Sequence, residues 1–373
     1  MALQKSYAAK FYGQDGTTFL RNFTTEKPLD AALPYLKEAP TFTSRLNGGQ
    51  GECVLDIALP FDDFDASIDF MHIVDLWCYD SNNPRGRRIY RGFISKYEPY
   101  IENGSEGVRV TLLGLVSLLS FSFYKNGSSY TVSHSSQDPE TIARAVIDHF
   151  NTIYGGNLIG YSGASTDPVS VSVSVDFEDQ KWADAVEKIH SLAGTDWWWF
   201  IDADGLFWFQ AKPSAATHTF TIGKDIDSLV CPKDSEKVIN DVQVRWSGGD
   251  YDYSDVTSQA KFGTGSSPSG KRSEVISASD LTSLTAAQQR GQKEVNDNKD
   301  EKIKATLVIN SAYDLESLRP GDTVNIRNLR KDNTFFVDNL QIASVTYEPD
   351  RCTLELEEEA SDFGLELQAF VDS

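Results

Sequence analysis

Residues that could perform chemistry are scattered along the 373-residue chain instead of standing at motif spacing. No HxxxH, HExxH or CxxC pattern occurs, so we predict no zinc site. The segment Gly160-Tyr-Ser-Gly163 lacks the glycine two residues after serine that a nucleophile elbow needs. No Walker-type or GxGxxG loop is present. We therefore predict no catalytic, cofactor-binding or metal-binding residues among the isolated histidines and cysteines, which are His72, His134, His149, His190, His218, Cys53, Cys78, Cys231 and Cys352.

Carboxylates are the one abundant reactive type. Asp202-Ala-Asp204-Gly205 resembles part of a calcium loop, but the EF-hand frame would place ligands at Phe200 and Ala211, so a hairpin turn is the preferred interpretation. A solvated loop is also preferred for a second group, Asp62, Asp63, Asp65 and Asp69. A glycosidase needs two carboxyl groups ~5–10 Å apart, a distance that sequence does not give. A cell-wall or glycan hydrolase therefore stays open as an alternative.

The main basic cluster consists of Arg85, Arg87, Arg88 and Arg91, on a predicted hairpin tip and the strand that follows it. One interpretation is a solvated turn. The functional interpretation is a subunit interface, because cations facing an acidic neighbour fix the register of a contact.

Aromatic residues gather at residues 197–209, where two apolar runs flank the Asp-Ala-Asp-Gly turn and predict a tight β-hairpin. Consecutive strand residues point to opposite faces, so at least one of three adjacent tryptophans must be buried. We expect a structural core hairpin packed on the helix that begins at Trp182, and we keep a carbohydrate-binding adhesin as the alternative. The tryptophans of this core are Trp182, Trp197, Trp198, Trp199 and Trp208.

The elements that must position these residues fall into three predicted domains. Residues 1–118 read as short strands with regular turns, which is typical of an antiparallel barrel. Residues 119–216 mix two helices, one beginning at Asp138-Pro139, with a period-two strand over 169–175 and the aromatic hairpin. Residues 217–373 return to β structure, with a flexible Gly/Ser-rich loop and a polar helix inserted at about 247–302. The few apolar residues of that helix predict that it lies exposed or packs on a partner.

The formal charge of −21 argues against a protein that wraps nucleic acid, because binding by counterion release needs clustered Lys and Arg. The sequence contains no run of ~18 apolar residues, so we predict no membrane span. The start of the chain lacks the apolar core of a signal peptide, so we expect reduced thiols in a protein made in the cytoplasm.

The order of these features resembles the phage tail hub family. That family includes the baseplate hubs of contractile tails, the tail-tip hubs of long flexible tails, late control protein D and the N-terminal part of type VI secretion spike proteins. The features are the strand 51–60 with its Asp-rich turn, the strands 74–77, 88–95 and 108–114, the Trp182 helix followed by the aromatic hairpin, and Leu318-Arg-Pro-Gly-Asp-Thr-Val-Asn-Ile326. The resemblance covers roughly residues 45–358.

The resemblance implies a mainly β fold in which two antiparallel β-barrels flank a small α+β domain, the second barrel joining about 217–246 with 303–358. It implies a non-enzymatic homotrimer in the virion tail, assembled in the host cytoplasm. Its six similar barrels would adapt the sixfold tail tube to a threefold fibre or spike. The implied partners are tail tube, distal tail and tape measure proteins, with DNA passing through the lumen without specific binding. No cofactor and no membrane insertion are implied.

Overall fold

The computed structural model describes residues 5–26, 33–63, 68–81, 83–125, 127–154, 156–193, 197–263, 270–278, 284–328 and 340–357. The chain forms two compact units. The main unit comprises Met1–Leu229 and Thr306–Ser373, and the inserted unit comprises Val230–Ala305. The domain boundaries predicted at residues 118 and 216 stay predictions. No helix in the described part of the chain is long and apolar enough to cross a membrane.

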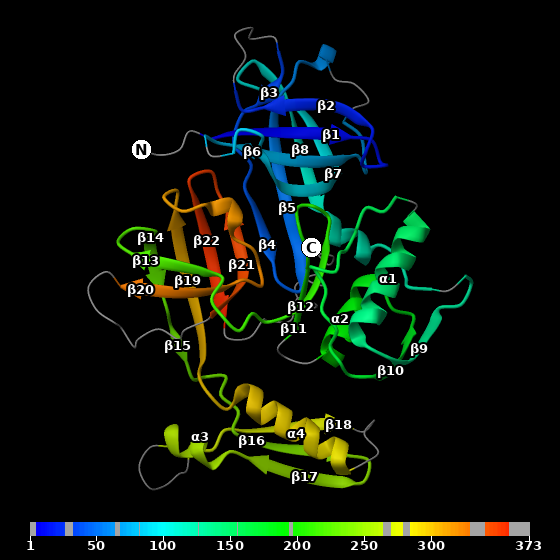
Figure 1. Ribbon diagram of the computed structural model, residues 1–373, viewed down its shortest axis with the longest axis vertical. Coiled ribbons are helices and arrows are strands. Elements are labelled where there is room, and N and C mark those ends of the chain that lie inside the picture. The colour runs from blue at the N-terminus through cyan, green and yellow to red at the C-terminus, as the bar shows by residue number, and fades with distance from the viewer. Residues whose placement is uncertain are drawn as a thin grey trace. The chain divides into compact units, whose positions relative to one another are not determined.

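A strongly curved antiparallel sheet forms the N-terminal part of the main unit (Figure 1). Its strands are β1 (Ser6–Tyr12), β2 (Phe19–Thr24), β3 (Tyr35–Leu36), β4 (Phe42–Arg45), β5 (Gly48–Ala58), β6 (Ile73–Tyr79), β7 (Arg87–Glu102) and β8 (Ser105–Gly114), with the 3₁₀ turn η1 (Phe61–Asp63) after β5. The strand order is β2-β1-β6-β7-β8-β5, and both β3 and β4 pair with β5. Alternate residues of β5, such as Leu55 and Ile57, point into a core inside the curve. Its closure into a barrel stays a prediction.

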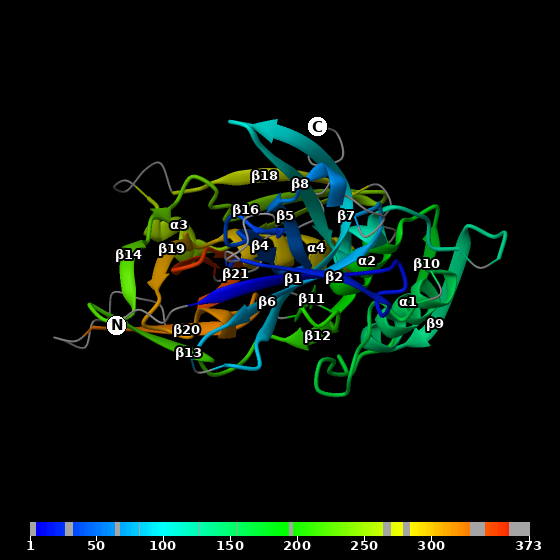
Figure 2. The ribbon, with the colours of Figure 1, turned by 90° about the horizontal axis from the view of Figure 1, so that it is seen from above.

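Two helices cover one side of the next region, where the views agree in placing α1 and α2 beside β9 and β10 (Figures 1 and 2). The elements are η2 (Leu115–Ser120), β9 (Thr131–Gln137), α1 (Pro139–Tyr154), β10 (Val173–Glu178), α2 (Trp182–Ala193), β11 (Trp197–Ile201) and β12 (Phe207–Ala211). The hairpin predicted at 197–209 is confirmed, with Trp199 opposite Phe209.

The strand predicted over 169–175 begins only at Val173. Asp138 is the reason. Its carboxylate accepts the N–H of Glu140 at the start of α1 and also the N–H groups of Val169 and Ser170. Ser170 takes a left-handed φ of 63°, which breaks the extended run that its period-two sequence favours.

Six strands close a barrel at the C-terminal side of the main unit: β13 (His218–Ile222), β14 (Ile226–Val230), β19 (Lys302–Asn310), β20 (Thr323–Asn328), β21 (Leu340–Tyr347) and β22 (Arg351–Glu357). The ring runs β13-β14-β19-β22-β21-β20 and returns to β13, and η3 (Leu315–Ser317) lies between β19 and β20. The barrel is not purely antiparallel as predicted, because β13 runs parallel to β20. A strand predicted at 334–337 lies outside the described residues.

Strand β4 joins the two β regions, because it pairs with β5 on one edge and with β21 on the other. The curved sheet and the barrel are therefore parts of one hydrogen-bonded sheet.

The inserted unit contains β15 (Lys233–Asp234), β16 (Asp241–Trp246), β17 (Gly249–Ser254), α3 (Val256–Lys261), β18 (Ser273–Ala278) and α4 (Leu284–Asn298). The sheet order β17-β16-β18 places residues 241–246 here and not in the barrel that we predicted them to join. Within the segment 247–273, which we predicted to be a flexible loop or insertion, the structure has β17 and α3. Helix α4, predicted to lie exposed or to pack on a partner, packs on this sheet through Ala287, Gly291 and Val295.

Candidate functional site

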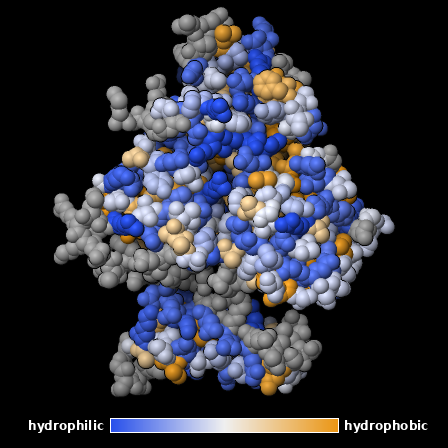
Figure 3. All heavy atoms as spheres, viewed as in Figure 1, coloured by the Kyte–Doolittle hydropathy of each residue, from blue (hydrophilic) through white to orange (hydrophobic). Residues whose placement is uncertain are grey.

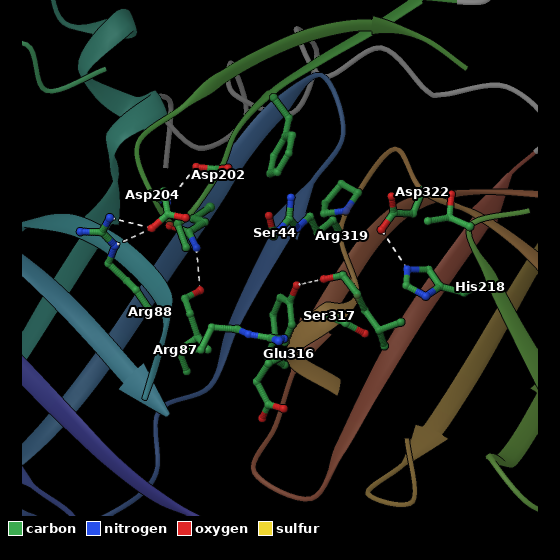
Figure 4. A pocket seen from close by; sticks show the side chains of 18 residues that line it. Ser44, Arg87, Arg88, Asp202, Asp204, His218, Glu316, Ser317, Arg319 and Asp322 are labelled. Carbon is green, nitrogen blue, oxygen red and sulfur yellow. Dashed lines mark hydrogen bonds and ion pairs between the residues drawn. The ribbon is translucent and has the colours of Figure 1, made fainter. Parts of the chain in front are cut away.

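A cavity of about 460 Å³ lies in the main unit, where the curved sheet, the turn of the aromatic hairpin and the barrel meet (Figure 4). Strands β4, β5 and β7 line one side, and the loop between η3 and β20 lines another. Its acidic and basic lining residues are Arg87, Arg88, Asp202, Asp204, His218, Glu316, Arg319 and Asp322.

The hairpin turn holds Asp202 and Asp204 at the cavity. Gly205 has a φ of 74°, which favours glycine, and a Cβ there would lie 2.8 Å from the Leu158 carbonyl oxygen. Asp202 Oδ1 accepts the N–H groups of Asp204 and Leu206, and Oδ2 accepts the Trp208 indole N–H at 2.7 Å. Burial nevertheless raises the pKa of Asp202 above its ordinary value, although these N–H groups lower it.

Arg88 ties this turn to the curved sheet. Its guanidinium donates to Asp75 Oδ2 at 2.9 Å and to Asp204 Oδ1 at 2.7 Å. Asp75 is 3% exposed, and its second oxygen lies 3.5 Å from Arg91 Nε. Burial lowers the pKa of Arg91, although Asp75 opposes that shift. The structure thus places two members of the predicted arginine cluster in an ion-pair network within the chain.

The other two members lie at the surface. Arg87 is 3.4 Å from Asp314, a pair between exposed groups, and Arg85 is exposed on the β6–β7 turn. A subunit interface at the four arginines stays a prediction.

On the barrel side, His218 has both ring nitrogens occupied. Nε2 lies 2.9 Å from Asp322 Oδ2, and Nδ1 lies 2.9 Å from the Tyr313 hydroxyl. A nucleophilic triad needs a serine, threonine or cysteine at the second nitrogen. Here the hydroxyl of Tyr313 takes that place, and burial raises the pKa of Tyr313 above its ordinary value.

A buried ion pair joins the residue before β1 to η3, the turn between β19 and β20. Lys5 Nζ lies 2.7 Å from Glu316 Oε1, and their side chains are 7% and 10% exposed. The Cys78 thiol donates to the same carboxylate, and burial raises its pKa to about 12. A thiol with that pKa carries almost no thiolate near neutral pH, so it is not a nucleophile there.

Each carboxylate that lines the cavity is therefore held by the chain itself: Asp202 by N–H groups, Asp204 by Arg88, Glu316 by Lys5 and Asp322 by His218. These contacts link the curved sheet, the hairpin turn and the segment that carries η3 and β20.

The tryptophans of the hairpin divide between two faces. Trp182, the first residue of α2, and Trp199 of β11 are both buried in the core that α1 and α2 help to form. The Trp199 indole donates to Glu187 of α2 at 3.0 Å. Trp197 is half-buried on this face.

Trp198 packs on the opposite face with Leu46, Phe200 and Trp208. Trp198 is 5% exposed, and the Arg319 guanidinium lies 5.6 Å from the Trp208 ring centroid. A sugar platform needs open ring faces, which this arrangement does not offer at Trp198.

The Asp-rich loop divides between described and undescribed residues. Asp62, Asp63 and Asp69 are exposed, and Asp65 lies outside the described residues. No group of three or more His, Cys, Asp or Glu in the described ranges is placed to hold a metal ion.

Sequence reasoning missed Asp75, Lys5, Glu316 and Asp322. Asp75 carried a signal, because a carboxylate inside the apolar strand 73–79 needs a buried cation. Lys5 and Glu316 stand 311 positions apart, so no local pattern could pair them.

On the face of the main unit that Figure 3 shows, the hydrophobic residues among those described lie in small separate groups between hydrophilic ones.

Comparison with solved structures gives the fold. The 43 kDa tail protein of prophage MuSo2 from Shewanella oneidensis matches with a TM-score of 0.64 and 12% identity over 95% of this chain and 96% of that one. A tail protein from Neisseria meningitidis matches with a TM-score of 0.60 and 11% identity over 94% and 96%. Prophage tail protein gp18 from Listeria monocytogenes matches with a TM-score of 0.57 and 10% identity over 98% of each chain.

The chain has the fold of these tail proteins. No family model matches it, and no curated protein matches it in sequence. In each comparison the likeness extends over nearly the whole length of both chains, so it includes the curved sheet, the helical region and the barrel.

Proposed function

We propose that the protein is a structural, non-enzymatic hub of a phage tail tip or baseplate. The observation that carries this proposal is a fold shared with tail proteins over 94% or more of the chain. The cavity residues support it, because each lining carboxylate is engaged within the chain and none is left as an acid or base for a substrate.

The hub acts as a homotrimer. Each protomer contributes the closed barrel and the curved sheet as two barrel-like bodies, so three protomers form a ring of six. Strand β4 supports this role, because it pairs with both bodies and sets their relative position within one protomer. The ring adapts a sixfold tail tube to a threefold fibre or spike, and its neighbours in the virion are tail tube, distal tail and tape measure proteins.

The ring has a negative lumen through which DNA passes during ejection. The net charge of −21 supports this, because phosphates find few cations on such a surface. A lumen lined mainly by Lys and Arg in an assembled ring would contradict this part of the proposal.

The experiment is a mass measurement in solution by light scattering over a range of concentrations. The expected species is about 124 kDa, three times the 41.4 kDa chain. A strict monomer at the highest concentration would contradict the hub. A zymogram on purified peptidoglycan tests the other half of the proposal, and clearing of the gel would show an enzyme instead.

A further inference from the structure

We propose that a basic and aromatic face on β1, β6 and the β6–β7 turn binds the acidic surface of a second copy of this chain. The face, called here the Lys10 face, consists of Lys10, Trp77, Tyr79, Arg85 and Arg87. The inference rests on the trimer proposed above, and it names one of the two surfaces that meet in each subunit contact.

The Lys10 face is continuous through its contacts. Trp77 and Tyr79 alternate along β6, so they share the side of the sheet that faces away from the core. Lys10, on the neighbouring strand β1, holds its ammonium 4.1 Å from the Trp77 ring centroid and 5.9 Å from that of Tyr79.

The turn between the two arginines lies against the ring of Tyr79. Gly86 has a φ of 77°, and a Cβ there would lie 2.5 Å from Cε1 of Tyr79. The chain therefore passes directly over the tyrosine ring, with Arg85 before the contact and Arg87 after it. The position requires glycine both for its backbone angle and for this close approach.

The cations of the Lys10 face differ from the neighbouring arginines because they are not neutralised by buried carboxylates. Arg88 and Arg91 are engaged by Asp75 and Asp204. In contrast, neither Lys10 nor Arg85 forms an ion pair with any residue that the structure describes. Arg87 has only the exposed Asp314 at 3.4 Å, and such surface pairs contribute little.

A second copy fits this face by charge. The chain carries 55 acidic and 34 basic side chains, so a second copy offers more carboxylates than cations for this face to meet. In a threefold ring each contact joins two different surfaces, so a basic face on one protomer can meet an acidic face on the next. Arginine and aromatic residues are also the types that dominate binding energy at the centre of protein interfaces.

The test compares two charge-reversal pairs in the full chain. Lys10→Glu with Arg85→Glu alters the Lys10 face. Lys125→Glu with Lys181→Glu changes the net charge equally in the α1 and α2 region, and Lys125 likewise lies over an aromatic ring, that of Tyr130. Trimer dissociation is measured by sedimentation across concentrations, at about 0.15 M salt and at roughly threefold higher salt.

The Lys10-face pair should raise the trimer dissociation constant about tenfold or more, as loss of close interfacial charge contacts does, while the control pair leaves it near the wild-type value. Higher salt should weaken the wild-type trimer and weaken the Lys10-face variant less. Arg85→Glu alone should give part of the effect. It lies on an exposed turn, and an unchanged near-ultraviolet circular dichroism spectrum shows that the fold is intact.

Other outcomes overturn the inference. Equal trimer stability in both variants places the contact elsewhere and leaves the hub standing. A wild-type protein that stays monomeric removes both the trimer and this face. Retention of a single-stranded 20-mer of DNA by the wild type, lost in the Lys10-face variant, would assign the face to nucleic acid instead.

Discussion

The chain covers a small sheet with helix in two places, and the two places are built from opposite kinds of residue. In the main unit, α1 and α2 enclose Trp182 and Trp199 with many large side chains. In the inserted unit, α4 approaches β16 and β17 through Ala287, Gly291 and Val295, spaced four residues apart. Large side chains fill space and tolerate helices at a distance, whereas small ones let a helix backbone come close to the sheet.

This difference explains why the packing of α2 could be predicted from the sequence and the packing of α4 could not. The apolar face of α2 stands out in sequence because Trp182, Val186 and Ile189 recur at helical spacing. The face of α4 is a row of small residues in a polar helix, so its pattern is typical of an exposed segment. The first two substitutions below test this difference. One removes a large side chain from the core under α1 and α2, and the other adds a large side chain where α4 meets its sheet.

The largest effect is expected from Trp199→Ala. Trp199 is 1% exposed and donates its indole N–H to Glu187, so the change opens a cavity and removes a hydrogen bond. The free energy of unfolding of the main unit should fall by about 3–5 kcal/mol. Urea unfolding followed by near-ultraviolet circular dichroism measures it. Trp197→Ala, on the same strand but half-buried, should cost clearly less; equal losses would mean that burial does not set the cost.

Gly291→Leu should come next. A Cβ at this position would lie 3.1 Å from Cγ2 of Val244, so a leucine must push α4 away from β16. Overpacking of this kind costs about 1–3 kcal/mol. Thermal unfolding of the variant measures it, and Gln292→Leu, exposed on the next position of α4, is the control and should change stability little. A Gly291→Leu protein as stable as that control would show that the helix does not pack closely.

Asp202→Asn tests the polar part of the aromatic hairpin, with an expected effect of about 1 kcal/mol. Burial raises the pKa of Asp202 in the folded state above its value in the unfolded chain. The stability that this group contributes is therefore fully present below the unfolded pKa and is lost as the pH rises through the folded pKa. The stability of the wild type relative to the variant should fall across that window, measured by urea unfolding from about pH 3 to 7. A difference that stays constant with pH would contradict the raised pKa.

The smallest effect is expected from Gly291→Ala, where two terms oppose each other. Alanine favours the helix by about 1 kcal/mol over glycine, but its methyl group meets Val244. The net change in unfolding free energy should be near zero. In a Val244→Ala background the contact is gone, so the same change should stabilise the protein, and a double-mutant cycle reads the difference. Equal effects in both backgrounds would remove Val244 as the obstacle.

Local elements of the fold followed from particular residues. Asp138-Pro139 marks the start of α1, and the Asp-Ala-Asp-Gly turn marks the hairpin at 197–209. The strand over 169–175 failed because the same Asp138 captures backbone N–H groups 31 and 32 positions later, which a window of neighbouring residues does not contain. The residue range of α4 could be predicted from the sequence. Its packing could not, because the close approach of the helix to the sheet depends on which residues lie opposite its small side chains.

The candidate site divides in the same way. The tryptophans and the arginine cluster were visible as runs of one residue type. Their partners were not visible in the sequence, because Arg88, Asp75 and Asp204 come from three separate segments of the chain. The Lys10 face likewise needs the pairing of β1 with β6, which brings residues 67 positions apart to one surface.

By itself, the sequence determined the residues that must be buried, the turns and most of the local elements, because these depend on side-chain type and on neighbours within a few positions. It also determined the acidic charge that any partner surface meets. Tertiary structure alone decided that β13, β14 and β19 to β22 close a ring, that β4 ties this ring to the curved sheet, and which arginines are already neutralised. Those features depend on contacts between residues tens to hundreds of positions apart, and such contacts exist only after the chain has folded.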